Sequence, residues 1–71
     1  MNVVIIGSGN VASTLGRLIQ GNNHKVVQVT SRNIEHAKLL ADELQSSYTD
    51  YSGALDKGAD IFIIEIGRAH V

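Results

Sequence analysis

Two glycines and an alanine near the start of the chain have the spacing of a phosphate-binding turn. Gly7, Gly9 and Ala12 follow the pattern Gly-x-Gly-x-x-Ala, between the apolar run at positions 3–6 and an apolar-periodic segment. In a strand–turn–helix context, the first glycine allows a sharp turn, the second lets the backbone approach a pyrophosphate, and the third small residue lets the helix pack on the strand. The phosphates then lie at the positive end of the helix. We therefore predict a dinucleotide site at the turn that holds Gly7 and Gly9 and at the start of the following helix; the alternative is a purely structural turn.

The residues that end the second apolar run indicate which dinucleotide binds. In NAD-binding proteins an Asp or Glu holds the ribose hydroxyls at this point, whereas this chain has Thr30, Ser31, Arg32 and Asn33. A guanidinium can pair with a 2′-phosphate through two hydrogen bonds and lie over an adenine ring, and a serine hydroxyl can donate a further hydrogen bond. Ser31 and Arg32 therefore favour NADP over NAD, and the missing acid also disfavours FAD. In the alternative interpretation, Ser31 and Arg32 only begin a loop and Asn33 caps the next helix.

Strands and helices must position these residues, and the spacing of apolar residues predicts where the strands and helices lie. Apolar runs predict strands at positions 1–6, 25–30 and 60–64, and a weaker signal predicts one at 46–49. One helix is predicted from a cap at Asn10 to about position 20, a second begins after a cap at Asn33, and positions 50–57 form a short helix or a turn. The expected buried faces are Val11, Leu15, Leu18 and Ile19 on the first helix, with Gly16 beside them for close approach, and Ile34, Ala37, Leu40, Ala41 and Leu44 on the second.

This order of elements predicts an α/β fold, the N-terminal half of a Rossmann fold. Strands and helices alternate as β-α-β-α-β-α-β, and right-handed crossovers then give a parallel sheet of order 3-2-1-4. Both long helices cover one face of that sheet, and only the short segment 51–57 crosses the other, so we expect alternate strand residues there to face water. A chain of 71 residues forms one small domain, which we place at positions 1–64.

Composition argues against several other classes of function. The net charge of -1 gives no basic excess for nucleic-acid binding, and no apolar run approaches the roughly 20 residues of a membrane span. Without cysteine the chain can form no disulfide, thiolate metal site or cysteine nucleophile, and no metal site is predicted. His24 and His36 are predicted to be surface residues. A cytoplasmic location is the default expectation.

Three segments of the chain resemble one group of Rossmann-like proteins: IGSGNVA at 6–12, VQVTSR at 27–32 and GADIFII at 58–64. The group pairs an NADP-binding N-terminal domain with a C-terminal domain of unknown function, and it is related to pyrroline-5-carboxylate reductases and coenzyme F420-dependent NADP reductases. The resemblance implies NADP at Gly7, Ser8, Gly9, Asn10, Val11, Ser31 and Arg32.

The same resemblance implies what this part of such a protein does. It indicates the cofactor half of an NADPH-dependent oxidoreductase acting on a small imine or carbonyl compound. In the relatives a C-terminal half largely forms the substrate site and the dimer interface, so the full-length parent is expected to be a homodimer and no catalytic residue can be assigned. The alternatives are a non-catalytic nucleotide-binding or sensing module and an inactive fragment.

Residues 65–71 break the pattern that precedes them. The relatives continue with a small or apolar residue where this chain has Glu65. Back-translation of positions 66–71 as ATC-GGA-AGA-GCA-CAC-GTC matches a widely used sequencing adapter, whose preceding AG would complete the codon of Glu65. We therefore expect 65–71 to be a non-native tail that follows a shortened gene, and we assign no function to Arg68 or His70. In the alternative, those two residues belong to a loop near the cofactor.

Overall fold

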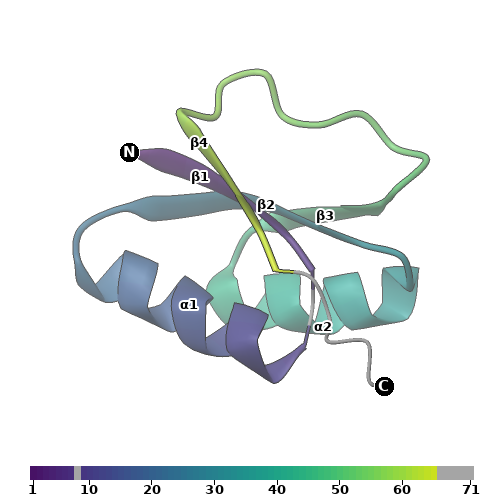
Figure 1. Ribbon diagram of the computed structural model, residues 1–71, viewed down its shortest axis with the longest axis horizontal. Helices are drawn as coiled ribbons and strands as arrows, with labels where there is room; N and C mark the ends of the chain where they lie inside the picture. Colours follow the sequence, from purple (N-terminus) through teal and green to yellow (C-terminus); the bar gives the residue numbers. More distant parts are fainter. Residues whose placement is uncertain (8, 66–71) are drawn as a thin grey trace.

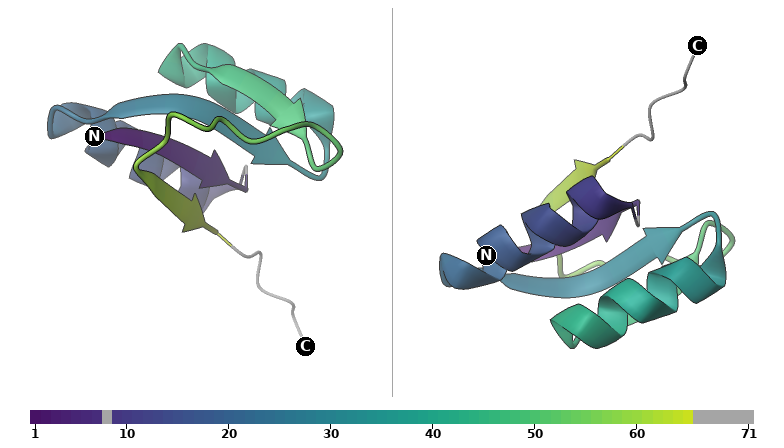
Figure 2. Two further views of the ribbon diagram at one scale, coloured as in Figure 1. Left: turned by 90° about the horizontal axis from the view of Figure 1, so that it is seen from above. Right: turned by 90° about the horizontal axis from the view of Figure 1, so that it is seen from below.

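The computed structural model describes residues 1–7 and 9–65, which form a two-layer α/β unit. Within these ranges the elements are β1 (Asn2–Ile6), α1 (Asn10–Gly21), β2 (Lys25–Ser31), α2 (Ile34–Leu44), β3 (Ser47–Asp50) and β4 (Ile61–Ile64). The strands are parallel and lie in the order β3-β2-β1-β4, as Figure 2 shows from both faces. The predicted fold class and strand order are therefore confirmed.

Both helices pack on one face of the sheet, and the segment 51–60 crosses the other (Figure 1). The predicted turn, rather than a helix, occupies 51–57, so the third crossover contains no helix among the described residues. Neither helix of the described ranges is long and apolar enough to cross a membrane. The carboxyl ends of all four strands meet at a single edge of the sheet, which is where parallel α/β sheets bind their ligands.

The core between the helices and the sheet depends on small residues of α1. Its buried members are Val3, Ile5, Ala12, Val26, Val29, Ala37, Leu40, Ala41 and Leu44. Gly16 is also buried, and a Cβ there would lie 2.5 Å from Leu44 Cδ1 and 3.3 Å from Ile5 Cδ1. The predicted close approach at Gly16 therefore exists, and it brings α1 against α2 as well as against β1.

Three residues of the predicted buried faces are exposed. Val11 and Leu18 are 57% exposed and Ile34 is 47% exposed, whereas Leu15 and Ile19 are half-buried. The inward stripe of α1 passes through Ala12 and Gly16, one turn apart, and at about 100° per residue Val11 and Leu18 lie roughly a quarter-turn or more away from it. Ile34 is the first residue of α2, at the end of that helix rather than over the core.

A β-bulge in β2 orients the Gln28 side chain so that it hydrogen-bonds to the segment 51–60. Val3 pairs with Val26 but Val4 pairs with Gln28, so Val27 is the extra residue and Gln28 points away from the helices. The buried Gln28 side chain donates from Nε2 to the Ala54 carbonyl (3.0 Å) and accepts at Oε1 from the Asp56 amide (2.8 Å). The two bonds occupy the Ala54 carbonyl and the Asp56 amide, backbone groups that would form helical hydrogen bonds if this segment were a helix.

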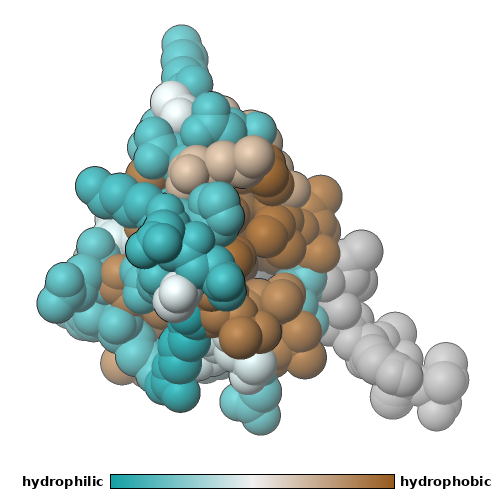
Figure 3. Space-filling model, turned by 90° about the vertical axis from the view of Figure 1, so that its left-hand side faces the viewer, coloured by the Kyte–Doolittle hydropathy of each residue, from teal (hydrophilic) through white to brown (hydrophobic). Residues whose placement is uncertain are grey.

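The face opposite the helices is less bare than the sequence predicts. Val4 is completely buried there. Its neighbour on β4 is Phe62, and Phe62 and Ile64 are 46% and 62% exposed, so the expectation holds only at the outer strand. Apolar side chains also gather on one side of the molecule in Figure 3. The exposed apolar residues of β4 and α1 are Ile61, Phe62, Ile64, Val11 and Leu18.

Candidate nucleotide-binding site

The turn after β1 requires its first glycine. Gly7 has a φ of +133°, which L side chains rarely adopt, and its amide donates to the Thr30 carbonyl at 2.8 Å. A Cβ on Gly7 would also lie 2.7 Å from the Glu65 carbonyl oxygen. The protein's own fold therefore explains Gly7 without a ligand.

The second glycine has no comparable structural reason. Gly9 has φ -80° and ψ -171°, an extended conformation open to any residue. The nearest described atom to a Cβ on Gly9 would be Glu65 Oε1 at 3.7 Å, an ordinary contact. A glycine here leaves space outside the N-terminus of α1 that the protein itself does not fill, which fits the close approach of a pyrophosphate.

The N-terminus of α1 carries no side-chain cap. Gly9, not Asn10, is the N-cap, because the Gly9 carbonyl already accepts from the Ser13 amide at 3.0 Å and Asn10 is the first helical residue. The cap predicted at Asn10 is therefore wrong. Among residues 1–7 and 9–65 no side chain accepts from the first-turn amides, and the first turn contains no acidic residue. Free N–H groups and the helix dipole make this end favourable for an anion.

The end of β2 places a cation beside this turn. Ser31 is buried, and its Oγ accepts from the Asn33 amide at 3.3 Å. Asn33 Oδ1 accepts from the amides of Glu35 (2.9 Å) and His36 (3.2 Å), which confirms the predicted cap of α2. Arg32 lies between these two fixed residues, exposed, and makes no ion pair within the described ranges.

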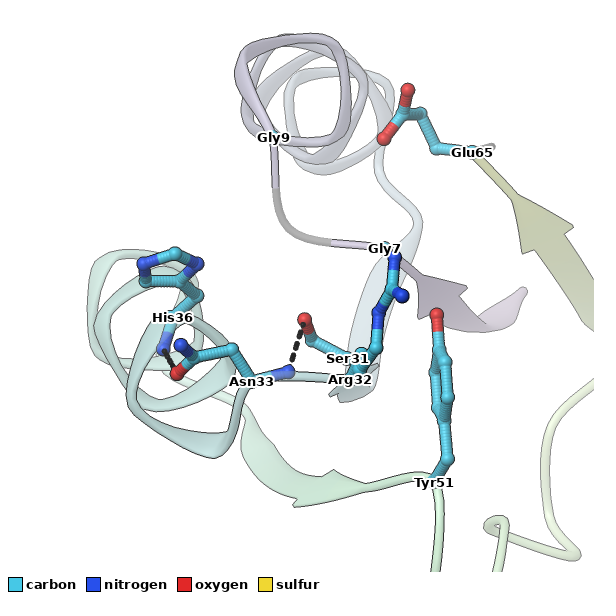
Figure 4. A pocket seen from close by; sticks show the side chains of 8 residues that line it. All are labelled: Gly7, Gly9, Ser31, Arg32, Asn33, His36, Tyr51 and Glu65. Atoms are coloured by element: carbon cyan, nitrogen blue, oxygen red, sulfur yellow. Dashed lines mark hydrogen bonds between the residues drawn. The ribbon is translucent and has the colours of Figure 1, made fainter. Parts of the chain in front are cut away.

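A pocket of about 570 Å³ brings the glycine turn and the end of β2 together (Figure 4). Its lining residues are Gly7, Gly9, Ser31, Arg32, Asn33, His36, Tyr51 and Glu65. Four of the seven predicted site residues are therefore in one pocket. Asn10 lines an adjoining pocket of about 210 Å³ between α1 and α2, Val11 is exposed on α1 outside the main pocket, and Ser8 lies outside the described residues.

Four pocket residues were not predicted as site residues. Asn33 was predicted only as a helix cap, and each of the other three follows or begins an element at the carboxyl edge of the sheet. Tyr51 comes directly after β3, Glu65 directly after β4, and His36 is in the first turn of α2. The rule that parallel strands present ligands at their carboxyl ends could have found Tyr51 and Glu65. No sequence motif indicates either residue, because Tyr51 follows a weakly predicted strand and Glu65 belongs to the segment expected to be non-native.

The charges around the pocket have opposite signs on opposite sides. Arg32 is an exposed cation that lines the pocket, and Glu65 presents its carboxylate to the glycine turn, with Oε1 3.1 Å from the position of a Cβ on Gly7. Hydrogen bonds from the Ser52 hydroxyl and amide hold the pKa of Asp50, at the end of β3, below its usual range. Within the described residues, no group of three or more histidines, cysteines or acids could hold a metal ion.

Comparison with known proteins identifies the family. The model of the family described as NADP oxidoreductase, coenzyme F420-dependent, matches residues 2–71. The chain belongs to this family. The match confirms both the predicted resemblance and the predicted cofactor class, NADP.

A solved structure supports the same assignment. A crystal structure of a candidate NADP oxidoreductase from Bacteroides fragilis superposes with a TM-score of 0.85 at 30% sequence identity. The alignment covers 94% of this chain but 26% of the Bacteroides protein, so this chain spans about a quarter of that relative. A search of curated proteins gave no significant match.

The pocket of this NADP oxidoreductase domain fits the cofactor in part. Gly9 leaves room at a helix end that has no side-chain cap, and Arg32 supplies a cation where NAD-specific proteins have an acid. Glu65 is unfavourable, because its carboxylate faces the glycine turn where phosphate oxygens would lie.

Proposed function

We propose that this chain is the NADP-binding portion of an oxidoreductase that reduces a small imine or carbonyl compound. The glycine turn and the start of α1 would bind the pyrophosphate, and the end of β2 would bind the adenosine 2′-phosphate. The residues proposed for these roles are Gly7, Ser8, Gly9, Asn10, Val11, Ser31 and Arg32.

The observation that supports the pyrophosphate site is the difference between the two glycines. Gly7 is required by its φ of +133°, whereas Gly9 has an ordinary conformation and space around the position of a Cβ. Since the fold would accept a side chain at position 9, a bound ligand that needs the space explains why the residue there is glycine. The first-turn amides of α1, which no side chain of the described residues caps, favour an anion as that ligand.

The end of β2 supports NADP rather than NAD. Arg32 is exposed into the pocket, and Ser31 and Asn33 on either side of it are fixed by hydrogen bonds. A guanidinium so placed can form two hydrogen bonds to a phosphate, while a carboxylate at the same position would repel it. Losing such a charge-assisted contact costs about 1.5–3 kcal/mol, or roughly ten- to a hundredfold in affinity.

The chemistry of hydride transfer would come from the cofactor. The described residues hold and orient the nucleotide, and none of them is proposed as catalytic. The substrate site and the homodimer interface are proposed to lie in the remainder of the parent protein, since this chain spans 26% of the solved relative. Coenzyme F420 is a second candidate hydride partner because the family description names it.

Cofactor preference tests the proposal. NADPH and NADH are titrated against the unaltered chain, the Arg32→Lys variant and the Arg32→Asp variant, with nucleotide fluorescence as the readout. We expect NADPH to bind more tightly than NADH, Arg32→Lys to keep the preference, and Arg32→Asp to reverse or abolish it. Equal binding of both nucleotides by the unaltered chain would contradict the proposal.

A second measurement separates an enzyme from a binding module. The parent protein is incubated with NADPH and either cyclic imines, small carbonyl compounds or oxidised coenzyme F420, and consumption of NADPH is followed. Turnover with an imine or carbonyl supports the proposed reaction, and turnover with coenzyme F420 alone supports the second candidate. Tight NADPH binding with no turnover would favour the non-catalytic module.

A further inference from the structure

Tyr51 is an exposed aromatic residue on the wall of the pocket, with no assigned role. Its side chain is 59% exposed, so it does not belong to the core, and in the described part of the chain its hydroxyl has no hydrogen-bond partner. The chain's other tyrosine, Tyr48, is on the same segment but does not line the pocket. An aromatic ring left in water at a nucleotide-sized pocket offers a surface on which a base can stack.

The turn that carries Tyr51 is held in place by its own hydrogen bonds. Asp50 Oδ1 accepts from the Ser52 amide (3.0 Å) and the Ser52 hydroxyl (2.6 Å), and the Asp50 carbonyl accepts from the Gly53 amide at 3.0 Å. Gly53 also packs so closely on Thr49 that a Cβ there would collide with the threonine side chain. Tyr51 therefore sits in the middle of a closed turn of the kind in which an aspartate side chain caps the backbone two residues on.

Arg32 extends from the neighbouring strand end toward the same space. In Figure 4 the Tyr51 and Arg32 side chains both run from the carboxyl edge of the sheet toward Gly7, and both line the pocket. A guanidinium is planar and stacks on aromatic faces, and a phenol ring does the same. Two flat groups that lie beside a turn proposed to bind phosphate match the base and the phosphates of an adenine nucleotide.

We propose that Tyr51 is the platform for the adenine ring of the dinucleotide, with Arg32 on the opposite side of the base. This inference rests on the proposed function, since it presumes that NADP binds in this pocket. The base stacks on the Tyr51 ring through its π-face, so the interaction needs the ring and not the hydroxyl. Tyr51 would then contribute to affinity for every adenine nucleotide, whereas Arg32 would also distinguish those that carry a 2′-phosphate.

Tyrosine fluorescence gives a direct readout, because the chain has two tyrosines and no tryptophan. In the Tyr48→Phe variant all the emission comes from Tyr51. Adenosine 2′,5′-bisphosphate is the test ligand, and nicotinamide mononucleotide, which has no adenine, is the control. We expect the bisphosphate to quench the emission of Tyr48→Phe and the mononucleotide to leave it unchanged.

Substitution of Tyr51 separates the ring from the hydroxyl. Base stacking contributes about 1–3 kcal/mol, so Tyr51→Ala should weaken binding of the bisphosphate by about tenfold, which corresponds to about 1.4 kcal/mol. Tyr51→Phe should retain the affinity within about twofold and lose the quenching, because the ring remains and only Tyr48 still emits. Calorimetry supplies the affinities, and circular dichroism confirms that each variant is folded.

The possible failures are distinguishable. If the unaltered chain binds no adenosine bisphosphate, the proposed function fails. If the unaltered chain binds it and Arg32→Asp weakens binding, but Tyr51→Ala binds as tightly as the unaltered chain, the platform is overturned while the proposed function stands. Equal losses in Tyr51→Ala and Tyr51→Phe would also overturn it, since the hydroxyl would then carry the contact.

Discussion

Removing the charge of Glu65 should tighten nucleotide binding. The carboxylate oxygen Oε1 lies 3.7 Å from the position of a Cβ on Gly9 and 3.1 Å from that of a Cβ on Gly7, where a pyrophosphate would make its closest approach. At about 4 Å in water two unit charges repel by about 1 kcal/mol, and a pyrophosphate brings two charges of which one is nearer. The repulsion relieved by Glu65→Gln is therefore about 1–2 kcal/mol, or about five- to thirtyfold in Kd.

Isothermal titration with NADPH at two salt concentrations measures this effect. Glu65→Gln keeps the size of the side chain and removes only its charge. Asp42→Asn is the matched control, because it makes the same change of net charge on an exposed position of α2 outside the pocket. We expect the gain to appear in Glu65→Gln alone and to shrink as added salt screens the repulsion. Equal affinities for Glu65→Gln and the unaltered chain would refute the electrostatic reasoning.

Four further predictions concern the turn, the core, the tyrosine loop and the tail. Gly9→Val should weaken NADPH binding, measured by calorimetry, about tenfold or more with little change in thermal unfolding. Gly7→Val should instead destabilise the fold by about 1–3 kcal/mol, because the φ of Gly7 is positive. Equal effects of the two variants on binding and on unfolding would contradict the separate roles given to the two glycines. Thr30 is 2% exposed and its Oγ1 has no partner among the described residues, so Thr30→Val should raise the free energy of unfolding in urea by about 1 kcal/mol; a loss of stability would reveal a partner for the hydroxyl. Hydrogen bonds from Ser52 to the ionised form lower the pKa of Asp50, so the turn they stabilise is fully intact above the usual aspartate pKa of about 3.9 and weakens as the pH falls below that value through the lowered pKa. The NMR signals of Tyr51 should therefore shift on acidification in the unaltered chain but not in Asp50→Asn. Residues 65–71 should be foreign to the gene, and genomic sequencing through the codon of Ile64 that found Ile66 to Val71 in frame would rule this out.

The strand order and the cap of α2 could be predicted because they follow from local sequence. Runs such as Val3–Ile6 are apolar on both faces, which is typical of strands in the interior of a parallel sheet, and long crossovers then restrict the topology. Asn33 is followed by a helical pattern and accepts from two first-turn amides as expected. In each case the residues that decide the structure are neighbours along the chain.

Features that depend on contacts between distant residues were not predictable. The bulge at Val27 turns Gln28 toward Ala54 and Asp56, more than two dozen residues later, and no local pattern signals it. The cap at Asn10 was predicted from the usual preference for a polar side chain, but the tight turn places Gly9 there instead. The buried face of α1 was misjudged because large apolar residues were favoured over the small ones that allow α2 to approach.

Half of the pocket could be predicted from the glycine spacing and the end of β2. The residues of the other half all lie at the carboxyl edge of the sheet, but no common sequence motif connects them. Tyr51 follows a strand of weak propensity, and Glu65 belongs to the segment expected to be foreign. Their relation to the glycine turn exists only once β3 and β4 are aligned beside β2 and β1.

The central position of β1 has a consequence for the way this protein is made. β1 is the earliest of the four strands to leave the ribosome, yet it lies between β2, which follows soon after, and β4, which comes last. The Asn2 amide donates to Asp60 Oδ2 at 2.8 Å and the Asn2 carbonyl accepts from the Asp60 amide at 2.7 Å, across 58 positions of sequence. During synthesis one edge of β1 therefore stays unpaired until nearly the whole described chain has emerged. Contacts of such long range form slowly, and an unpaired strand edge can recruit another chain in the meantime. Of the two interior strands, β1 therefore waits longer for its second neighbour than β2 does.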